Sequence, residues 1–515
     1  MREAAPQVVS CHRTSRHQRL ADYNTFLMAR FFLQNFGCRA TQADGAAIER
    51  QLATRGLERA GSAREADVVV FNTCTVTAAA DQDARAAIRR AHRENPQTKI
   101  MVTGCYAQRA PEEVAALPGV TWVVGNSHKH RVAEIATADS NPHGRGQDFV
   151  PLERVALSAP PFTLIGDIFA HTELIAAPVF AADDISEKTR PNLKVQDGCN
   201  NRCSFCIIPS VRGQSRSMHL ERVIEEARAL VHAGYREIVL SGINLGRWGR
   251  DFQPQQRFAQ LLRALLTDTD VEKIRISSVE PMDWTDDLIA LVAGSPRIAK
   301  HAHVPLQSGS DRILRAMYRR YRPWHYVEKI RKIREAMPDA AIGADVMVGF
   351  PGESDELFEE SRSFLERLPF TYLHVFTYSS RPGTASAAMP DQVPVHVARE
   401  RNRVLRDLAA RKNLEFRRRF IGQRLDVITL QRGDAESTEA LSDNYLKVQI
   451  RAQRRGNEWL SVRIADVISD GLVAALEPQG CHPDPAKRER DRLCGIQRSS
   501  GTSSAAEPIP RSASE

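Results

Sequence analysis

The chain contains short apolar runs and stretches in which apolar residues recur every third or fourth position. The order of these two patterns divides the chain into segments. Short apolar runs predict strands at 28–34, 67–72, 99–104 and 120–125. The stretches between these runs repeat apolar residues every third or fourth position, which predicts helices. Because strands alternating with helices are typical of parallel sheets, we expect an α/β domain over 28–135, preceded by a loose extension over 1–27.

The same alternation returns between residues 188 and 395. Six strands are predicted, at 192–196, 236–242, 273–279, 301–306, 341–349 and 372–378. Amphipathic helical patterns separate them, for example at 220–234 and 257–266. Six βα units are fewer than the eight of a complete barrel, so we expect a partial (βα)6 barrel. The Pro- and Gly-containing stretch 136–187 is interpreted as a linker.

The C-terminal part has a different pattern. A basic helix is predicted over 396–421, and strand patterns dominate 422–477. These strands predict a small antiparallel β-barrel, similar to the barrels that bind nucleic acid. Residues 481–515 are rich in Pro, Ser, Ala and charges, and we expect them to be disordered.

Composition excludes several classes of protein. The 515 residues are 42% hydrophobic and 26% charged, which excludes a mostly disordered chain. No run of about 18 apolar residues occurs, so we expect no membrane-spanning helix. The first 27 residues lack the apolar run of a secretory signal, and Met28 is a candidate initiator. We therefore expect a cytoplasmic protein, where cysteines more often bind metals or catalyse than form disulfides.

Three of the nine cysteines lie together on one predicted loop after a strand: Cys199, Cys203 and Cys206. We call them the second cysteine trio, because another group of three precedes them in the chain. Three thiolates at this spacing fit one face of a cubane iron–sulfur cluster and leave one iron open to a chelating substrate. A zinc knuckle is the alternative. Structural zinc usually takes four ligands in two pairs, and a second pair is missing here.

A first cysteine trio consists of Cys38, Cys74 and Cys105, which are far apart in sequence. Each lies just past the carboxyl end of a predicted parallel strand, and such ends gather at one edge of a sheet. We therefore expect a second three-thiolate cluster with an open iron. Three unrelated buried cysteines are the alternative, since free cysteine is often buried. No role is expected for the three cysteines of the terminal stretches, Cys11, Cys481 and Cys494.

The loop C-x-x-x-C-x-x-C after the first strand of a partial barrel resembles that of the radical S-adenosylmethionine (SAM) superfamily. The resemblance implies that the methionine part of SAM chelates the open iron. It also implies that an electron from the reduced cluster cleaves the sulfonium to give methionine and a 5′-deoxyadenosyl radical. Two clusters in this order resemble the methylthiotransferase family, whose members combine an N-terminal cluster domain, a radical barrel and a C-terminal TRAM barrel.

Several strings carry the resemblance, which spans about residues 28–477. They are NTCTVT (72–77), TGCYAQR (103–109), KVQDGCNNRCSFCIIPSVRGQSRS (194–217), PLQSGSDRILRAM (305–317) and DVMVGFPGES (345–354). The first two are most similar to the branch that acts on N6-threonylcarbamoyladenosine at position 37 of tRNA. Asn35 and Thr41 depart from the family, which usually has Thr and Asn at these positions. The departures concern hydrogen bonds around the first trio rather than ligation.

The family resemblance implies that one SAM methylates a sulfur on the first open iron. A second SAM is split at the barrel cluster, and the methylthio group is delivered to C2 of the adenine. SAM contacts are expected at Gly242, Asn244, Ser278, Glu280, Gln307, Ser308 and Asp345. The alternatives are a turn residue for Gly242 and a surface carboxylate for Glu280. Arg212 and Arg216 are expected to neutralise the reduced cluster or a substrate phosphate, or else to be surface arginines.

Two basic stretches suggest an RNA surface. Residues 397–420 contain nine basic and three acidic residues, and 312–334 contain nine basic residues, one acidic residue and interleaved aromatics. Basic grooves with aromatic side chains suit phosphate contact and base stacking. We expect RNA contacts at Arg417, Arg418 and Arg419; solvated helix faces with ion pairs are the alternative.

These observations predict a tRNA methylthiotransferase with two [4Fe–4S] clusters and SAM. The expected partners are tRNA and an electron donor such as flavodoxin or ferredoxin, with no membrane and a monomeric state. One alternative is the same reaction on isopentenyl-adenosine in tRNA or on an aspartate of a ribosomal protein. Another is a two-cluster electron carrier with an RNA-binding tail.

Overall fold

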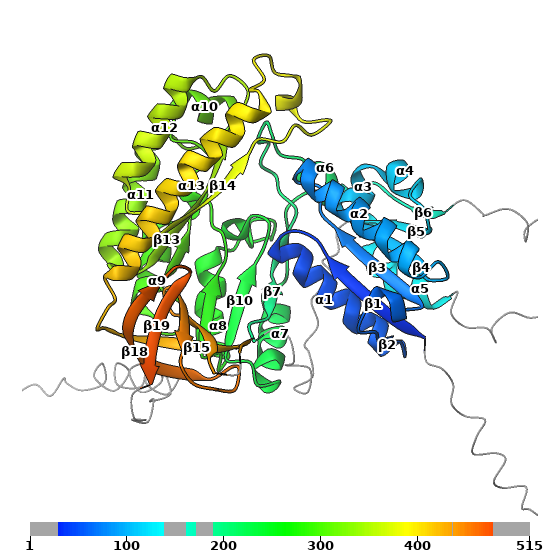
Figure 1. The fold of residues 1–515 in the computed structure, drawn as a ribbon, viewed down its shortest axis with the longest axis horizontal. Helices are drawn as coiled ribbons and strands as arrows, with labels where there is room; N and C mark the ends of the chain where they lie inside the picture. The colour runs from blue at the N-terminus through cyan, green and yellow to red at the C-terminus, as the bar shows by residue number, and fades with distance from the viewer. Residues whose placement is uncertain (1–28, 139–160, 171–188, 435, 477–515) are drawn as a thin grey trace, which may run out of the picture.

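The computed structural model describes residues 29–138, 161–170, 189–434 and 436–476 (Figure 1). These residues form an N-terminal α/β domain, a partial barrel and a small C-terminal β-barrel. Four predicted features lie outside the described residues: the extension over 1–27 with Cys11, the candidate initiator Met28, most of the linker, and the disordered tail with Cys481 and Cys494.

The N-terminal domain is built on a parallel sheet in the order β2-β1-β3-β4-β5-β6. Its strands are β1 (Arg30–Asn35), β2 (Glu58–Arg59), β3 (Val68–Thr73), β4 (Lys99–Gly104), β5 (Val120–Gly125) and β6 (Phe162–Leu164). The four predicted strands are all present. The two edge strands that the sequence did not predict have only two and three residues, which is too short for a recognisable period.

Helices cover both faces of this sheet. They are α1 (Arg39–Thr54), α2 (Ala78–Glu94), α3 (Cys105–Arg109), α4 (Pro111–Ala115) and α5 (Val132–Ala138). Val69 and Phe71 of β3 pack in the core with α2, while Val68 and Val70 pack in the core with α1 and α5. Because both faces are buried, β3 is a continuous apolar run rather than an alternating one.

The partial barrel has the six predicted strands. They are β7 (Asn192–Lys194), β10 (Glu237–Ser241), β11 (Lys273–Ile276), β12 (His301–His303), β13 (Ala341–Val348) and β14 (Tyr372–Thr377). They form two parallel three-stranded sheets, β7-β10-β11 and β12-β13-β14. Single backbone bridges, such as Ser278 with His303, continue the order between the two sheets.

Helices surround the outside of the barrel. They are α6 (Ile208–Arg212), α7 (Leu220–His232), α8 (Phe258–Asp268), α9 (Asp286–Gly294), α10 (Asp311–Ala316), α11 (Pro323–Ala336) and α12 (Asp355–Arg367). A short antiparallel ribbon of β8 (Gln196–Asp197) and β9 (Arg216–Ser217) brackets the loop of the second cysteine trio. Each helix buries one apolar stripe, as Leu261, Leu262 and Leu265 of α8 do.

Helix α13 (Val395–Arg418) leads into the C-terminal barrel. The strands of this barrel are β15 (Arg424–Gly433), β16 (Thr438–Ser442), β17 (Lys447–Ile450), β18 (Trp459–Ile468) and β19 (Gly471–Leu476). The barrel is closed in the order β15-β16-β17-β19-β18. Its pairs are antiparallel as predicted, except that β17 and β19 pair in parallel. Strand β16 was not predicted individually, because the alternation of apolar and polar residues in TEALS is short.

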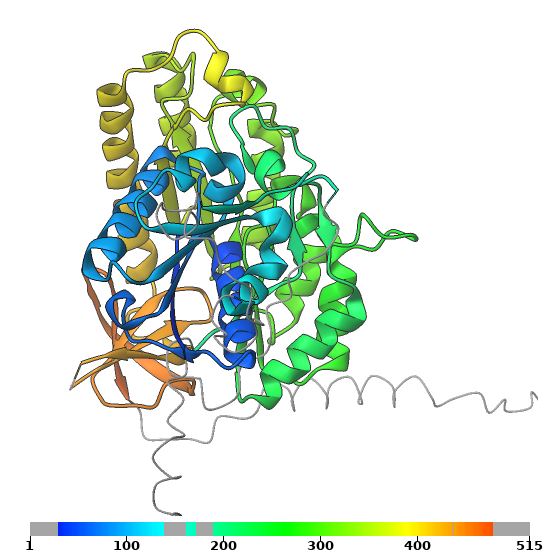
Figure 2. The same ribbon diagram turned by 90° about the vertical axis from the view of Figure 1, so that its right-hand side faces the viewer.

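The N-terminal domain lies beside the partial barrel, with α1 close to β7 (Figures 1 and 2). The C-terminal barrel packs under the strands of the partial barrel (Figure 1). Its β16–β17 turn reaches the buried Arg275, whose guanidinium donates to the carbonyls of Ser442 and Asp443 at 3.1 and 3.0 Å. The carboxyl ends of the strands in both larger domains carry the cysteines at the shared interface.

Candidate functional site

The first cysteine trio converges at one edge of the N-terminal sheet, as predicted. Strands β1, β3 and β4 are neighbours, and Asn72 of β3 pairs with both Asn35 of β1 and Thr103 of β4. Thr73 pairs with Gly104, so Cys74 and Cys105 follow adjacent strand ends, and Gly37, next to Cys38, lies against Cys74. Burial, followed by repulsion from Cys105, raises the pKa of Cys74 to about 12.

Backbone and amide groups close in around these sulfurs. The Val76 N–H donates to Cys74 Sγ, and Asn126 Nδ2 donates to Cys105 Sγ, both at 3.5 Å. Gly37 has φ +102°, and a Cβ there would lie 2.6 Å from Cys74 Cβ and 2.9 Å from its sulfur. Glycine is therefore required beside Cys74 for both space and backbone conformation.

The two departures from the family pattern are accommodated next to this trio. Asn72 Nδ2 donates to Asn35 Oδ1 at 2.9 Å and to the Thr41 carbonyl at 2.8 Å. Gly45 leaves the room that Asn35 occupies, since a Cβ at that position would overlap the amide. Thr41 Oγ1 lies 3.6 Å from Cys38 Sγ. Both residues thus have partners that position the loop carrying Cys38.

The second cysteine trio lies on the loop between β8 and β9, at the mouth of the barrel. The Asn201 N–H donates to Cys199 Sγ at 3.4 Å, and Asn244 Nδ2 lies 3.7 Å from the same sulfur. Arg319 Nη1 donates to Cys203 Sγ at 3.2 Å. Burial and the neighbouring Cys203 raise the pKa of Cys206 to about 12.

Sequence reasoning missed Arg319 as a residue of this site and placed it within a basic surface stretch. Its side chain is 5% exposed and also forms an ion pair with Glu280. Burial lowers its pKa, but Tyr321, Glu280 and Cys203 together raise it well above the ordinary value. Arg319 thus holds a permanent positive charge against the second trio, and it gives Glu280 a partner inside the barrel mouth rather than at the surface.

The predicted SAM residues lie at several places around the barrel mouth, and the first of these is the end of β10. Gly242 is close to Gln196, which accepts a hydrogen bond from the Asn244 N–H at 2.7 Å. Three polar side-chain atoms at the ends of β10 and β11 are buried and have no hydrogen-bond partner among the described residues: Ser241 Oγ, Asn244 Oδ1 and Ser277 Oγ. Such unpartnered groups fit a polar ligand at this end of the barrel.

Three other predicted SAM residues are held in the barrel interior. Ser278 Oγ lies 3.0 Å from His303 Nδ1, and Asp345 Oδ1 lies 3.3 Å from His303 Nε2. Gln307 has φ +72°, and its N–H donates to the Asp345 carbonyl at 2.8 Å. Asp345 and Ser278 thus lie near the two nitrogens of one imidazole, an arrangement that the separate strand positions did not predict.

Ser308 has a side-chain partner outside the barrel mouth, and its contact with SAM stays a prediction. This residue is 1% exposed, and its hydroxyl lies 3.0 Å from the hydroxyl of Ser361 on α12. Because α12 packs on the outside of the barrel, the Ser308 side chain is directed away from the mouth. Gly349, in the turn after β13, packs against α13, since an added Cβ would lie 2.5 Å from Ala398 Cβ.

Arg212 lies at the domain interface and not on the surface. Its guanidinium donates to Asp197 Oδ1 at 2.9 Å, to Asp44 Oδ2 of α1 at 3.0 Å and to Thr41 Oγ1 at 3.4 Å. Arg216 is also largely buried, with its Nη2 3.7 Å from Asp197. The surface alternative is therefore wrong for both arginines.

Arg212 belongs to an interdomain charge cluster that the sequence did not predict, comprising Asp44, Lys129, Lys194, Asp197 and Arg212. Lys129 Nζ lies 2.9 Å from Asp44, and Lys194 Nζ contacts Asp44 and lies 3.1 Å from Asp197. Burial would raise the pKa of Asp44, but the three cations lower it instead. With two carboxylates and three cations, the cluster leaves positive charge near the first trio.

A second polar contact joins the two domains on the other side of the first trio. Arg381, which follows β14, contacts Asp81 of α2 and donates to Thr75 Oγ1 at 3.2 Å. Arg109 donates to the same Thr75 hydroxyl at 2.8 Å. Thr75 directly follows Cys74, so this contact fixes the loop carrying that thiol against the barrel.

The two trios are close neighbours across the interface. Cys105 packs in one apolar cluster with Ile207 and Val211, and Ile207 directly follows Cys206. Asn126 Nδ2, which donates to Cys105, also donates to the Val211 carbonyl at 2.7 Å. Among the described residues, no group of three His, Cys, Asp or Glu side chains is placed to hold a single metal ion.

The predicted RNA contacts need revision at Arg417. This side chain is buried and donates to the carbonyls of Ile468 and Gly471 at 2.6 and 2.9 Å, so it fixes the β18–β19 turn. Arg418 and Arg419 are exposed, and Arg419 pairs with Asp339 at 2.8 Å. An RNA contact at these two residues stays a prediction.

The aromatic residues of stretch 312–334 are equally divided. Tyr318 and Trp324 are exposed. Tyr321 and Tyr326 are buried and donate to backbone carbonyls of the barrel, including those of Leu306 and Val304 at 2.7 Å. Half of these rings therefore stabilise the barrel core and are inaccessible to RNA.

Comparisons with known proteins match both larger domains. Residues 193–365 match the family model described as the radical SAM superfamily, and residues 30–125 match the uncharacterized protein family UPF0004. The chain is 38% identical over 426 residues to the threonylcarbamoyladenosine tRNA methylthiotransferase MtaB of Bacillus subtilis, covering 82% of this chain and 90% of that protein. The chain belongs to the radical SAM methylthiotransferases.

Two further relatives show the breadth of this family. The MtaB protein of Aquifex aeolicus is 36% identical, with 84% of this chain and 99% of that protein covered. The tRNA-2-methylthio-N(6)-dimethylallyladenosine synthase of Thermobifida fusca is 35% identical, with 85% of each chain covered. The predicted family is confirmed, and the protein is an enzyme whose family uses a [4Fe–4S] cluster and SAM. The electron-carrier alternative is wrong.

Proposed function

We propose that this enzyme adds a methylthio group to C2 of N6-threonylcarbamoyladenosine at position 37 of tRNA. The observation that carries the proposal is the pair of cysteine trios on the two sides of one domain interface, with Cys105 packed beside the residue that follows Cys206. The substrate follows from the strings NTCTVT and TGCYAQR and from the names of the relatives in Bacillus subtilis and Aquifex aeolicus.

The residues present fit two three-thiolate clusters. Each trio supplies three thiols, and each has N–H donors aimed at its sulfurs, from Val76 and Asn126 in the first and from Asn201 and Arg319 in the second. Hydrogen bonds to sulfur are one of the features by which proteins set cluster potentials. Cys38, Cys74 and Cys105 would hold one [4Fe–4S] cluster, and Cys199, Cys203 and Cys206 the other.

The mouth of the barrel fits SAM near the second trio. The unpartnered oxygens of Ser241, Asn244 and Ser277 offer acceptors for an ammonium group. When bound, the clusters and SAM supply the electron, the radical and the methylthio group. Gln196 fixes the Asn244 backbone and, through its Nε2, the carbonyls of Asp197 and Gly198 at 2.8 Å.

The remaining work of the protein is positioning and exclusion of water. The interdomain charge cluster and the Arg381 contact hold the first trio against the barrel mouth from two sides. A C–H bond of adenine is not acidic, so aim and protection of reactive species contribute more than proton transfer. The buried Cys74 and Cys105 and the apolar Ile207 and Val211 keep solvent from the interface.

We further propose that the enzyme acts as a cytoplasmic monomer and receives electrons from a carrier such as flavodoxin or ferredoxin. Among the described residues, no helix is both long and apolar enough to cross a membrane. A gel-filtration mass near that of one 57.5 kDa chain supports the monomer, and a mass near twice that value contradicts it.

The test is mass spectrometry of tRNA nucleosides from a strain lacking the gene. Expression of the wild-type chain should restore the 2-methylthio form of N6-threonylcarbamoyladenosine, whereas Cys74→Ala and Cys203→Ala should not. Restoration of 2-methylthio-isopentenyl-adenosine alone would assign the enzyme to the other tRNA branch. Methylthiolation of a ribosomal protein with no change in tRNA would overturn the tRNA substrate.

A further inference from the structure

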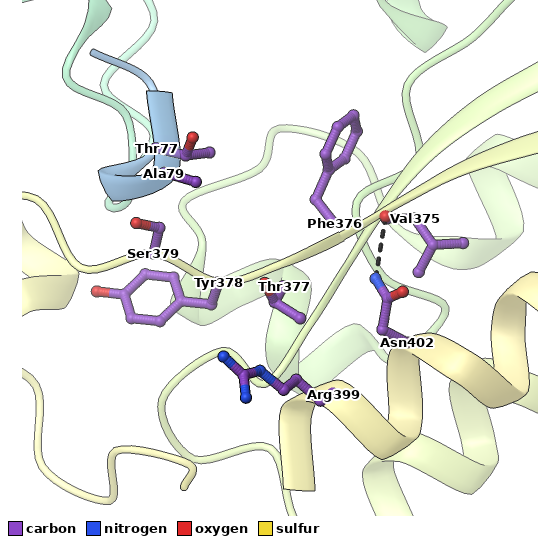
Figure 3. A pocket seen from close by; sticks show the side chains of 9 residues that line it. All are labelled: Thr77, Ala79, Val375, Phe376, Thr377, Tyr378, Ser379, Arg399 and Asn402. Carbon is purple, nitrogen blue, oxygen red and sulfur yellow. Dashed lines mark hydrogen bonds between the residues drawn. The ribbon is translucent and has the colours of Figure 1, made fainter. Parts of the chain in front are cut away.

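A cleft separates the start of α2 from the end of β14 and the start of α13, with a cavity volume of about 390 Å³ (Figure 3). One wall includes Thr77, three residues after Cys74, and the Ala78 N–H of this wall donates to Ser379 Oγ on the barrel side at 3.0 Å. The cleft therefore opens beside the loop that carries a thiol of the first trio. Its size lies within the range of about 300–1,000 Å³ typical of small-ligand sites.

An aromatic ring projects into this cleft from β14. Phe376 is 47% exposed and lines the cleft. Tyr372, His374 and Phe376 alternate along β14 and therefore share one face. Their ring centroids are 5.2 Å apart between Tyr372 and His374 and 6.5 Å apart between His374 and Phe376. This row continues inward to His303, whose centroid lies 5.6 Å from that of His374.

Such a row connects the barrel interior with the cleft through flat side chains. Nucleobases stack on aromatic rings regardless of base identity, because each base has a π-face. Phe376 at the outer end of the row offers the accessible ring (Figure 3). The geometry suits a flexible single strand whose bases enter the interface one after another.

A positive charge lies on the opposite lip of the cleft. Arg399 of α13 is exposed and has no ion-pair partner among the described residues. Its neighbour Arg403, by contrast, pairs with Glu400 at 2.6 Å and Asp407 at 3.1 Å. Arg406 is likewise exposed without an ion pair in the described part of the chain, and it lies two turns, about 10 Å, further along the helix. Two unpaired arginines in line suit successive phosphates.

We propose that this cleft binds one nucleotide of the substrate tRNA next to the nucleotide being modified, with its base on Phe376 and its phosphate at Arg399. The proposal rests on the proposed function, because it takes tRNA as the substrate. One nucleotide of a single strand can stack its base on the ring, place its phosphate at the cation and form hydrogen bonds with the hydroxyls of Thr77 and Ser379. Arg406 then contacts the phosphodiester that leaves the cleft.

The test measures binding of the reconstituted enzyme to a synthetic anticodon stem-loop that carries N6-threonylcarbamoyladenosine. Phe376→Ala should weaken binding by about 5- to 140-fold, the range that loss of one base stack produces, and Phe376→Trp should restore it. Arg399→Gln should lower the slope of log affinity against log salt by about 0.7–1, the value for one phosphate contact. Arg263→Gln on α8, an exposed arginine paired with Asp287, serves as the charge-matched control and should leave the slope unchanged.

Three results would overturn the proposal. The first is unchanged affinity in Phe376→Ala. The second is an unchanged salt slope in Arg399→Gln, because the proposal places a phosphate at this guanidinium. The third is failure of the wild-type enzyme to bind the stem-loop, which would overturn the proposed function as well. Iron content and RNA-independent cleavage of SAM should match wild type in each variant, so a loss of binding is not a loss of clusters.

Discussion

The two cysteine trios reach similar donor sets by different routes. The second trio is local: Cys199, Cys203 and Cys206 lie within eight residues on one loop between β8 and β9. The first trio is assembled by topology, because β1, β3 and β4 must pair in register before their carboxyl ends place three thiols together. The local site thus depends on one loop, whereas the other depends on the fold of a whole domain.

The surroundings of the trios differ in the same sense. Arg319 of the barrel donates directly to Cys203 of the barrel. The first trio has a nearby cation from each domain, Lys129 of its own domain and Arg212 of the barrel, and both hold Asp44 of α1. The comparison indicates that part of the charge beside the first site comes from the docked barrel, while the charge nearest the second comes from the barrel itself.

The sharpest test of two separate sites is removal of one ligand from each. Wild-type enzyme purified without oxygen should contain about eight irons per chain, and Cys74→Ala or Cys203→Ala should contain about four, because each trio holds its own cubane. Methylthiolation should be lost in both variants. Only Cys203→Ala should also lose reductive cleavage of SAM, measured as 5′-deoxyadenosine. Zinc in place of iron, or loss of all iron in either variant, would contradict two independent sites.

The next largest effect is expected from replacing the arginine that lies beside each trio. Arg212→Gln removes one buried cation from Asp44 and Asp197, which keep Lys129 and Lys194 as partners, so we expect a loss of about 1–3 kcal/mol of stability, measured by denaturant unfolding. The midpoint potential of the first cluster should fall, because a positive charge that stabilises the reduced form is removed. Redox titration followed by electron paramagnetic resonance measures this shift.

Arg319→Gln is the matched control for Arg212→Gln. It should lower the potential of the second cluster and leave that of the first in place, because its guanidinium contacts Cys203 and Glu280 within the barrel. If Arg212→Gln shifted only the second cluster, the assignment of its charge to the first trio would be wrong. Equal shifts of both clusters in both variants would indicate a general loss of structure.

Glycine substitutions sharpen the comparison further. Gly37→Ala places a methyl group 2.6 Å from Cys74 Cβ at φ +102°, and such a conformation costs a non-glycine residue about 1–3 kcal/mol. We expect partial loss of the first cluster, seen as fewer irons, with SAM cleavage retained. Gly56→Ala, at φ +86° but with open space around its Cβ, carries similar backbone strain away from the thiols. It should keep its iron, and the opposite result would locate the effect in folding rather than at Cys74.

The sequence predicted the positions of the cysteines more reliably than their surroundings, for a physical reason. Cysteine spacing and the ends of apolar strands are visible along the chain, so both trios and their strands could be placed in advance. Asp44, Lys129 and Arg212 come from three distant segments; the fold of the N-terminal domain brings the first two together, and docking of the barrel adds Arg212. Arg417 and Arg418 are neighbouring arginines that the sequence alone does not distinguish. Arg417 is buried because it packs against the β18–β19 turn, whereas Arg418 is exposed.

The smallest expected effect concerns the amide groups that donate to sulfur in each trio. Asn244→Ala removes one donor to Cys199, and Asn126→Ala removes one donor to Cys105 together with a bond to the Val211 carbonyl across the interface. Each neutral bond contributes about 0.5–1.5 kcal/mol, so both variants should keep about eight irons. Each should show a modest fall in the potential of its own cluster, measured by redox titration.

Because Asn126 also bridges the domains, its loss should slow methylthio transfer more than SAM cleavage, whereas loss of Asn244 should slow both equally. Identical kinetics in the two variants would mean that domain docking contributes no more to the first site than to the second.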